Sequence, residues 1–316
     1  MMSNTPADDL DCLIIGGGPA GLTAALYLAR FRRRFMIVDA GEARAEWIPA
    51  SHNIPMFANG IGGAALLERQ REHLRRYGVE IQQASVSKLG RSGDIFSAEM
   101  EPPNGSRHQV IARRVLLATG AVDVEPELPD LPNAVQRGLV RYCPICDGYE
   151  ARDRSIAVIG HGARGVGEAV FVARTYSDRV TLLTLGCALT LTDRQEQLVQ
   201  QHGIRTVQDR VSRLSIEGSR IAAVHAGGEE HRFDVLYSAL GLYHRSELAL
   251  GLGAEHDGAG ALLVDHHCQT TVKGLYAAGD IVRGLDQIVV AMGHAATAAT
   301  HIHNRCELPT EDEDEG

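Results

Sequence analysis

Residues 10–39 read LDCLIIGGGPAGLTAALYLARFRRRFMIVD. Within this stretch, the apolar run from Leu10 to Ile15 predicts a short strand, and a helical apolar pattern follows from Leu22 to about Ala29. A second apolar run begins at Phe35 and ends at Asp39, which predicts another strand. Strand, glycine-rich turn, helix and strand in this order predict the opening of a dinucleotide-binding α/β fold.

The turn after the first strand carries three spaced glycines. Gly16 permits a tight turn, Gly18 the close approach of a pyrophosphate, and Gly21 the close packing of helix on strand. The free N–H groups of the helix N-terminus then face the phosphates. The carboxylate after the second strand is placed to bind ribose hydroxyls. The predicted cofactor-binding residues of this segment are Gly16, Gly18, Pro19, Ala20, Gly21 and Asp39.

A second unit of the same kind begins at Ser155. A strand over residues 156–159 leads into a turn with Gly160, Gly162 and Gly165, then a helix to about Tyr176 and a strand over residues 180–184. The glycine spacing again predicts dinucleotide binding. However, the next residues, Thr184-Leu185-Gly186, offer neither a carboxylate for a ribose 2′-hydroxyl nor arginines for a 2′-phosphate. Either Arg164 or Arg194 supplies a phosphate contact, or the fold persists here with a weakened nucleotide specificity.

Cys143 and Cys146 lie ten residues ahead of this second unit, in RYCPICDGYE. Two thiols at this spacing can close into a disulfide, and one thiolate is readily stabilised by its surroundings. The same spacing is half of a tetrahedral zinc site, so zinc is the alternative. A second half-site is missing from the sequence, where the other cysteines, Cys12, Cys187, Cys268 and Cys306, occur singly and His266 and His267 are adjacent. We therefore predict a redox-active dithiol and no metal.

The composition sets the class and compartment of the protein. A chain of 316 residues with 44% hydrophobic residues is long enough for two packed domains. No apolar run approaches the roughly 18 residues of a membrane span, and the N-terminus lacks a signal-peptide pattern, so we expect a cytoplasmic protein. The net charge is −9, and residues 307–316 contribute six acidic side chains. This charge argues against nucleic acid binding and predicts a disordered acidic tail.

The order of these motifs resembles the low-molecular-weight thioredoxin reductases. The resemblance rests on the first glycine turn, then Ala118-Thr119-Gly120, Cys-Pro-Ile-Cys-Asp-Gly over residues 143–148, the second glycine turn, Gly279-Asp280 and Gln287-Ile288-Val289. It extends over about residues 10–303. Larger disulfide reductases of the glutathione reductase kind carry their cysteines near the first flavin fold, whereas residues 40–60 here contain no cysteine.

The resemblance implies an α/β architecture of two Rossmann-like nucleotide-binding domains. An FAD-binding domain, residues 1–122 and 248–306, would be interrupted by a dithiol or NAD(P)H-type domain, residues 123–247, and followed by the tail at 307–316. It also implies a homodimer. Further flavin-contacting residues implied by the resemblance are Asn53, Thr119, Gly120, Asp280, Gln287, Ile288 and Val289.

The mechanism that the resemblance implies runs from flavin to dithiol to a substrate disulfide. Cys146 would face the flavin, and Cys143 would be the outward nucleophile that forms a mixed disulfide. Asp147 could move the proton that the departing thiolate needs, a task that favours a raised pKa, or it could be a solvated turn residue. The partner would be a thioredoxin-like protein or a small-molecule disulfide or dithiol.

Three hypotheses follow for the function. The family donor is NADPH, but its His-Arg-Arg run is replaced here by Thr184-Leu185-Gly186. The first hypothesis is therefore a disulfide reductase that uses NADPH or another donor such as ferredoxin. The second is a flavin dithiol oxidase, because related oxidases share Cys-Pro-x-Cys and Gly-Tyr-Glu, although they have histidine in place of Asp147. The third is a flavin-binding redox sensor.

Overall fold

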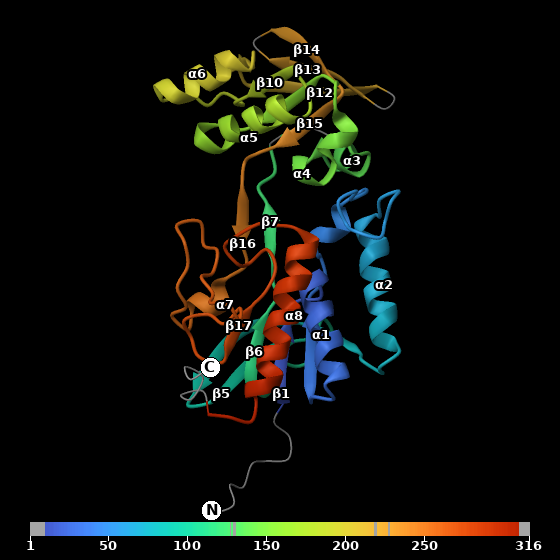
Figure 1. The fold of residues 1–316 in the computed structure, drawn as a ribbon, viewed down its shortest axis with the longest axis vertical. Coiled ribbons are helices and arrows are strands. Elements are labelled where there is room, and N and C mark those ends of the chain that lie inside the picture. Colours follow the sequence, from blue (N-terminus) through green and yellow to red (C-terminus); the bar gives the residue numbers. More distant parts are fainter. Residues whose placement is uncertain (1–9, 127, 129–130, 218–219, 227, 310–316) are drawn as a thin grey trace, which may run out of the picture. The chain divides into compact units, whose positions relative to one another are not determined.

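The computed structural model describes residues 10–126, 128, 131–217, 220–226 and 228–309 (Figure 1). The chain forms two compact units. The first consists of Met1–Ile48, Gly63–Val122 and Tyr243–Gly316, and the second of Pro49–Gly62 and Asp123–Leu242. The segments that connect them at residues 121–123 and 242–244 pair as strands β7 (Ala121–Asp123) and β16 (Leu242–His244). The assignment of FAD to one unit and of the dithiol chemistry to the other stays a prediction.

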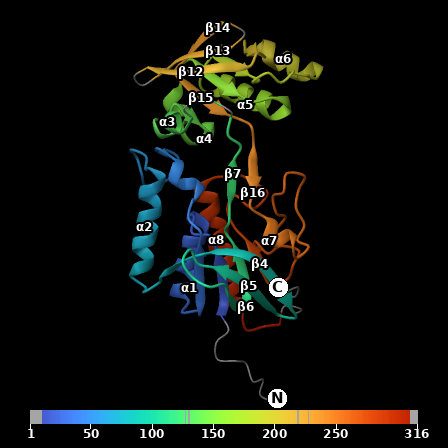
Figure 2. The same ribbon diagram turned by 180° about the vertical axis from the view of Figure 1, so that it is seen from behind.

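The first unit is built on a mixed sheet with the strand order β3-β2-β1-β6-β5-β4. Its strands are β1 (Leu10–Ile15), β2 (Phe35–Asp39), β3 (Ile81–Gln83), β4 (Ser85–Ser92), β5 (Ile95–Glu101), β6 (His108–Leu117) and β17 (Leu275–Ala277). Strand β6 pairs antiparallel with β5 through its first half and parallel with β17 through its last residues. Figure 2 shows the β4–β5 hairpin beside β6 from behind. The predicted strands at 10–15 and 35–39 are confirmed.

Helices α1 (Pro19–Arg30) and α8 (Ile288–Arg305) pack side by side against this sheet (Figure 1). Their contact surface is made of small side chains, which lets the two helices approach closely. It includes Ala20, Ala24, Ala25, Ala291, Ala295, Ala298 and Ala299, all buried in one hydrophobic cluster. The helix starts at Pro19, earlier than the apolar pattern alone predicts, because proline favours the first helical position. The unit also contains η1 (Arg44–Trp47), α2 (Gly63–Arg75) and α7 (Glu247–Leu250).

Arg114 of β6 is the largest fully buried side chain, with 1% of its surface exposed. Its Nη2 donates to the carbonyl oxygens of Arg305 and Leu308 at 2.9 and 2.8 Å, and Nη1 donates to the carbonyl of Arg113 at 3.0 Å. A helix leaves its last carbonyls without intrahelical partners. The buried guanidinium of Arg114 therefore provides hydrogen-bond donors to carbonyl groups at the C-terminal end of α8.

The second unit has a parallel sheet with the order β11-β10-β9-β15-β8 and an antiparallel sheet β12-β13-β14. The parallel strands are β8 (Val140–Arg141), β9 (Ile156–Ile159), β10 (Val180–Leu183), β11 (Arg205–Val207) and β15 (Val235–Ser238). The antiparallel strands are β12 (Val211–Glu217), β13 (Arg220–Ala226) and β14 (Glu229–Phe233). Its helices are α3 (Leu131–Gln136), α4 (Pro144–Asp147), η2 (Gly148–Ala151), α5 (Gly162–Thr175) and α6 (Asp193–Gln201).

The second glycine turn thus lies between β9 and α5, as the sequence predicts, and the α/β fold class with two Rossmann-like units is confirmed. In the part of the chain that the structure describes, no helix is both long and apolar enough to cross a membrane. Most of the predicted acidic tail, residues 310–316, lies outside the described residues. Its first residue, Glu307, forms an ion pair with Arg33 at 2.8 Å.

Candidate active site

Cys143 and Cys146 are joined by a disulfide at the start of the four-residue helix α4, with a Cα–Cα distance of 5.4 Å. Pro144 occupies the first helical position, and Cys143 is the N-cap. The backbone N–H of Cys146 donates to Sγ of Cys143 at 3.2 Å. A hydrogen bond of this kind favours negative charge on the sulfur, so the same geometry would stabilise a Cys143 thiolate after reduction. Among the described residues, no group of three or more His, Cys, Asp or Glu is arranged to hold a metal ion.

Asp147 at the end of α4 is held by two side chains from other elements. The hydroxyl of Tyr237 donates to Oδ1 at 2.8 Å, and Nη1 of Arg141 lies 3.3 Å from Oδ2. Burial raises the pKa of Asp147, while Arg141 and Tyr237 oppose that rise. The net direction is the one that a proton donor requires.

The segment 49–62 lies on the dithiol helix within the second unit. The backbone N–H of His52 donates to the carbonyl of Cys146 at 3.3 Å, and Nδ2 of Asn53 donates to the carbonyl of Ile145 at 3.3 Å. The His52 ring lies 3.8 Å from a carboxylate oxygen of Glu150. Asn53, which the resemblance assigns to the flavin, thus contacts the Cys-Pro-Ile-Cys backbone here.

Four residues of this site are not predicted as site residues from the sequence: Arg141, Tyr237, His52 and Glu150. One signal could have found Tyr237: a phenol inside the apolar run of β15 must meet a hydrogen-bond partner when buried.

The first glycine turn forms a cradle of backbone with no room for side chains on its inner side. Gly16 has φ +114°, and a Cβ there would overlap the carbonyl oxygen of Ala118. A Cβ on Gly21 would overlap the carbonyl oxygen of Gly16, whereas Gly18 faces open space. Asp39 accepts a hydrogen bond from the Gly17 N–H at 2.9 Å. This is the backbone shape that a pyrophosphate needs at a helix N-terminus.

Residues from the C-terminal part of the chain join this cradle. A Cβ on Gly279 would lie 3.2 Å from the Cβ of Ala20, which places Gly279-Asp280 beside the first turn of α1. Asp280 pairs with Arg44 at 3.0 Å, and its carbonyl lies 2.8 Å from the His244 ring. Thus Asp280 and the glycine turn, 260 positions apart in the numbering, share one neighbourhood.

The remaining residues implied for the flavin also lie in the first unit. Gln287 is the N-cap of α8, Ile288 begins that helix, and Val289 is 40% exposed. The Thr119 hydroxyl donates to the carbonyl of Arg245 at 2.6 Å, and Gly120 has φ +68°. The residues present fit a flavin dinucleotide. The glycine turn leaves open space at Gly18, and the carboxylates of Asp39 and Asp280 and the guanidinium of Arg44 lie around it.

The second glycine turn keeps its packing role. A Cβ on Gly165 would come within 2.5 Å of the Gly160 carbonyl carbon, whereas Gly162, with φ +58°, faces open space. At the end of β10, Thr184 is buried and its hydroxyl donates to the carbonyl of Cys187 at 2.6 Å. The Thr184 hydroxyl therefore makes its hydrogen bond within its own loop, and Thr184 does not replace the carboxylate that would bind a ribose 2′-hydroxyl.

An arginine from elsewhere in the sequence lies against this loop. A Cβ on Gly186 would lie 2.5 Å from Cγ and 3.4 Å from Nε of Arg210, which follows β11. Arg210 is exposed, and within the described ranges its guanidinium has no hydrogen-bond or ion-pair partner. Both loops follow the carboxyl ends of parallel strands, where α/β sheets bind nucleotides. Arg164 lies instead near Gly241, and Arg194 is exposed on α6.

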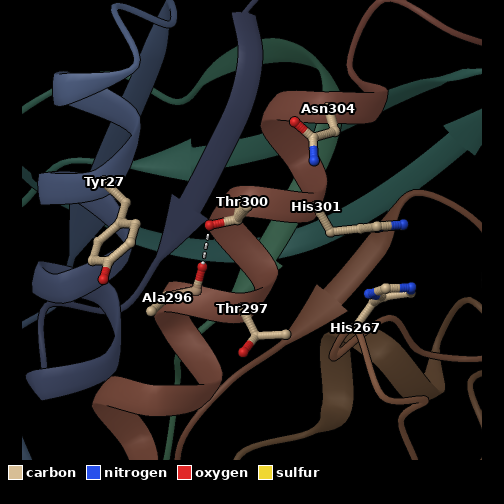
Figure 3. A pocket seen from close by; sticks show the side chains of 7 residues that line it. All are labelled: Tyr27, His267, Ala296, Thr297, Thr300, His301 and Asn304. Atoms are coloured by element: carbon tan, nitrogen blue, oxygen red, sulfur yellow. Dashed lines mark hydrogen bonds between the residues drawn. The ribbon is translucent and has the colours of Figure 1, made fainter.

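A shallow cavity of about 430 Å³ lies on the first unit, away from every predicted site residue. Figure 3 shows its lining: Tyr27 of α1, five residues of α8, and His267. The rings of His267 and His301 stack with centroids 4.1 Å apart, and the Tyr276 hydroxyl lies 2.9 Å from Nδ1 of His301.

A flavin-type glycine cradle in one unit and a Cys-x-x-Cys disulfide directly before the glycine turn of the other define a class, the flavoprotein disulfide oxidoreductases with two nucleotide-type domains. The sequence profile of the pyridine nucleotide-disulphide oxidoreductases matches residues 10–295, and the chain belongs to this family. The predicted resemblance to thioredoxin reductases is confirmed by the relatives.

The chain is 27% identical over 301 residues to the thioredoxin reductase of Treponema pallidum (strain Nichols), covering 92% of this chain and 95% of that protein. The crystal structure of thioredoxin reductase from Streptococcus pyogenes MGAS5005 matches with a TM-score of 0.84 and 26% identity, covering 93% of this chain and 97% of that one. The NADH dehydrogenase of Bacillus subtilis (strain 168) is 30% identical over 302 residues, covering 92% of this chain. The chain spans only 58% of that relative's length.

Proposed function

We propose that the protein is an FAD-dependent thiol–disulfide oxidoreductase that passes electrons through Cys146 and Cys143 to the disulfide of a thioredoxin-like protein. The observation that carries the proposal is the Cys143–Cys146 disulfide followed directly by a partly buried, hydrogen-bonded Asp147. The kinship with thioredoxin reductases supports it.

The first unit would hold the FAD. Gly16, Gly18 and Gly21 would receive the pyrophosphate, Asp39 a ribose, and Asp280 with the N-terminus of α8 the flavin side. When bound, FAD supplies the two electrons that reduce the disulfide.

Exchange with the substrate is carried out by the dithiol. The Cys143 thiolate attacks one sulfur of the substrate disulfide, the substrate S–S bond breaks, and a mixed disulfide forms. The first substrate sulfur leaves in this step as a thiolate and takes up a proton from solvent. The Cys146 thiolate then attacks Sγ of Cys143, and the second substrate sulfur leaves as a thiolate that takes up a proton from Asp147. The substrate gains two electrons, and the Cys143–Cys146 pair is oxidised. Ile145 and Tyr149, 46% and 63% exposed, would give a protein partner apolar contacts beside the dithiol.

An electron count tests this proposal. Anaerobic titration with dithionite is expected to consume about four electrons per bound flavin, two for the flavin and two for the disulfide. The Cys143→Ser/Cys146→Ser double variant is expected to consume two. Equal uptake by both proteins would contradict a flavin-linked dithiol.

For the donor, we propose NADPH with Arg210 as the cation beside its 2′-phosphate. Arg210→Ala is expected to weaken NADPH binding about tenfold, because a charge-assisted contact to phosphate is lost, and to leave NADH binding unchanged. Anaerobic bleaching of the flavin absorption by each nucleotide measures both affinities, with Arg174→Ala, an exposed arginine in the last turn of α5, as the matched control. An equal loss for NADPH and NADH would refute the role of Arg210.

A second candidate function is a flavin dithiol oxidase or a ferredoxin-linked reductase. One observation favours it. The Thr184 hydroxyl donates to the Cys187 carbonyl, and the loop has no carboxylate to bind a ribose 2′-hydroxyl. Bleaching by dithionite but by neither nucleotide would support it. The homodimer and the cytoplasmic location stay predictions; sedimentation of the purified protein measures the first.

A further inference from the structure

Each carboxylate oxygen of Asp147 has its own partner from a different strand. Tyr237 of β15 donates to Oδ1, and Arg141 of β8 faces Oδ2. The guanidinium of Arg141 is itself fixed, because Nη1 also donates to the Asp147 carbonyl at 3.2 Å and Nε donates to the Gly138 carbonyl at 2.8 Å. These contacts join two neighbouring strands of the parallel sheet, β15 and the edge strand β8, to the residue that follows the redox pair.

Tyr237 is buried completely, with 0% of its surface exposed. Its hydroxyl donates to Asp147 and also interacts with the Arg141 guanidinium. A phenol can both donate and accept. Tyr237 can therefore keep a hydrogen bond with Asp147 in either protonation state, donating to the carboxylate or accepting from the carboxylic acid.

The other ionisable groups near Asp147 come from three further places. Glu150 of η2 and Tyr176 after α5 interact electrostatically with Asp147, and His52 faces Glu150. The Tyr176 ring also fills the space in front of Gly148, where a Cβ would overlap it. The guanidinium of Arg141 thus contacts Asp147 directly, at a site where the Glu150 carboxylate adds a second negative charge.

We propose that Tyr237 and Arg141 are positioning residues that hold the Asp147 carboxyl and set the pH range over which it delivers a proton to the thiolate that departs from Cys143. This inference rests on the proposed function. Burial raises the pKa of Asp147, and both contacts lower it by favouring the carboxylate. Removal of either contact should raise it further.

The decisive variant is Tyr237→Phe, which removes only the hydroxyl. Since the acid form of Asp147 is the active one, exchange falls as pH rises through its pKa. In Tyr237→Phe this falling limb is expected to move up by about one pH unit, the size expected for one lost hydrogen bond to a charged group. Reduction of an alkyl disulfide by the prereduced protein measures the profile, because an alkyl thiolate is basic enough to take up a proton as it leaves.

Three further variants complete the experiment. Arg141→Met should move the falling limb in the same direction. Arg141→Lys should give a smaller shift, because lysine keeps the positive charge but loses the two-pronged guanidinium donor. Tyr243→Phe makes the same chemical change at an exposed tyrosine outside the site and should leave the profile unchanged. Thermal unfolding identifies any variant that fails to fold, and the arginine variants then carry the test.

A direct readout separates this inference from the proposed function. Carbon-13 carboxyl NMR of aspartate-labelled protein, with Asp147→Asn for assignment, measures the titration of Asp147 without flavin, donor or partner. An upward shift in Tyr237→Phe supports the inference even if no thioredoxin-like substrate is reduced. Superimposable Asp147 titrations in folded wild-type and Tyr237→Phe proteins would overturn it, whatever the turnover.

Discussion

Replacing Cys146 with serine is expected to abolish reduction of protein disulfides while leaving the flavin bound. Cys146 is the residue that resolves the mixed disulfide, so a serine there removes the thiolate that attacks Sγ of Cys143. The expected loss of turnover is on the order of 10³-fold or more, as is usual when a covalent catalytic residue is deleted. Because Cys143 and its hydrogen-bond donor at position 146 remain, the variant should accumulate a mixed disulfide with its partner.

Mass spectrometry of the Cys146→Ser protein, incubated with an oxidised thioredoxin-like protein, measures this adduct. Cys187→Ser is the matched control, because Cys187 is an exposed free thiol of the same unit and should leave turnover unchanged. An adduct at Cys187, or normal turnover by Cys146→Ser, would contradict the assigned roles of the pair.

Replacing Arg114 with methionine is expected to lower the free energy of unfolding by about 3–5 kcal/mol, the range seen when a buried charged partner is deleted. Methionine fills much of the volume but cannot donate, so the carbonyls of Arg113, Arg305 and Leu308 lose their partner. The change acts on the C-terminal end of α8. Helix α8 packs against α1, the helix that begins at the first glycine turn. Weaker flavin retention should therefore accompany the loss of stability.

Urea unfolding followed by circular dichroism measures this difference. Arg113→Met provides the control: its neighbouring side chain is half-buried and makes one longer bond, to the Cys306 carbonyl at 3.4 Å. We expect it to cost about 1 kcal/mol, the value of an ordinary hydrogen bond. If both variants lost the same stability, the buried position of Arg114 would have no special role.

The parts of this protein that sequence predicts well are those encoded by neighbouring residues. The glycine turns after Ile15 and Ile159 and the strands around them follow from local apolar patterns and from glycines such as Gly16, Gly21 and Gly165, where a Cβ would overlap backbone atoms. The fold class and the dithiol follow from the same short-range signals. Even the helix start at Pro19 is visible locally once proline is read as a first helical residue.

The parts that it predicts poorly depend on distant pairs. Tyr237 donates a hydrogen bond to Asp147, which lies 90 positions earlier in the sequence. Arg210 lies against Gly186, which belongs to a different loop. Thr184-Leu185-Gly186 contains no cation of its own, but the loop after the neighbouring strand β11 brings Arg210 to the same edge of the sheet. No periodicity in a single sequence reports which loops of a parallel sheet become neighbours.

The segment 49–62 has a consequence for dissecting this protein. It belongs to the second unit although it lies, in sequence, between η1 and α2 of the first. A fragment cut at 123 and 242 would contain the whole dithiol motif and both of its sheets, yet the carbonyls of Ile145 and Cys146 would lose Asn53 and His52. Such a fragment is an incomplete module. A synthetic peptide of residues 49–62 is the piece that would complement it, and its recruitment would report on the intact backbone of the redox helix.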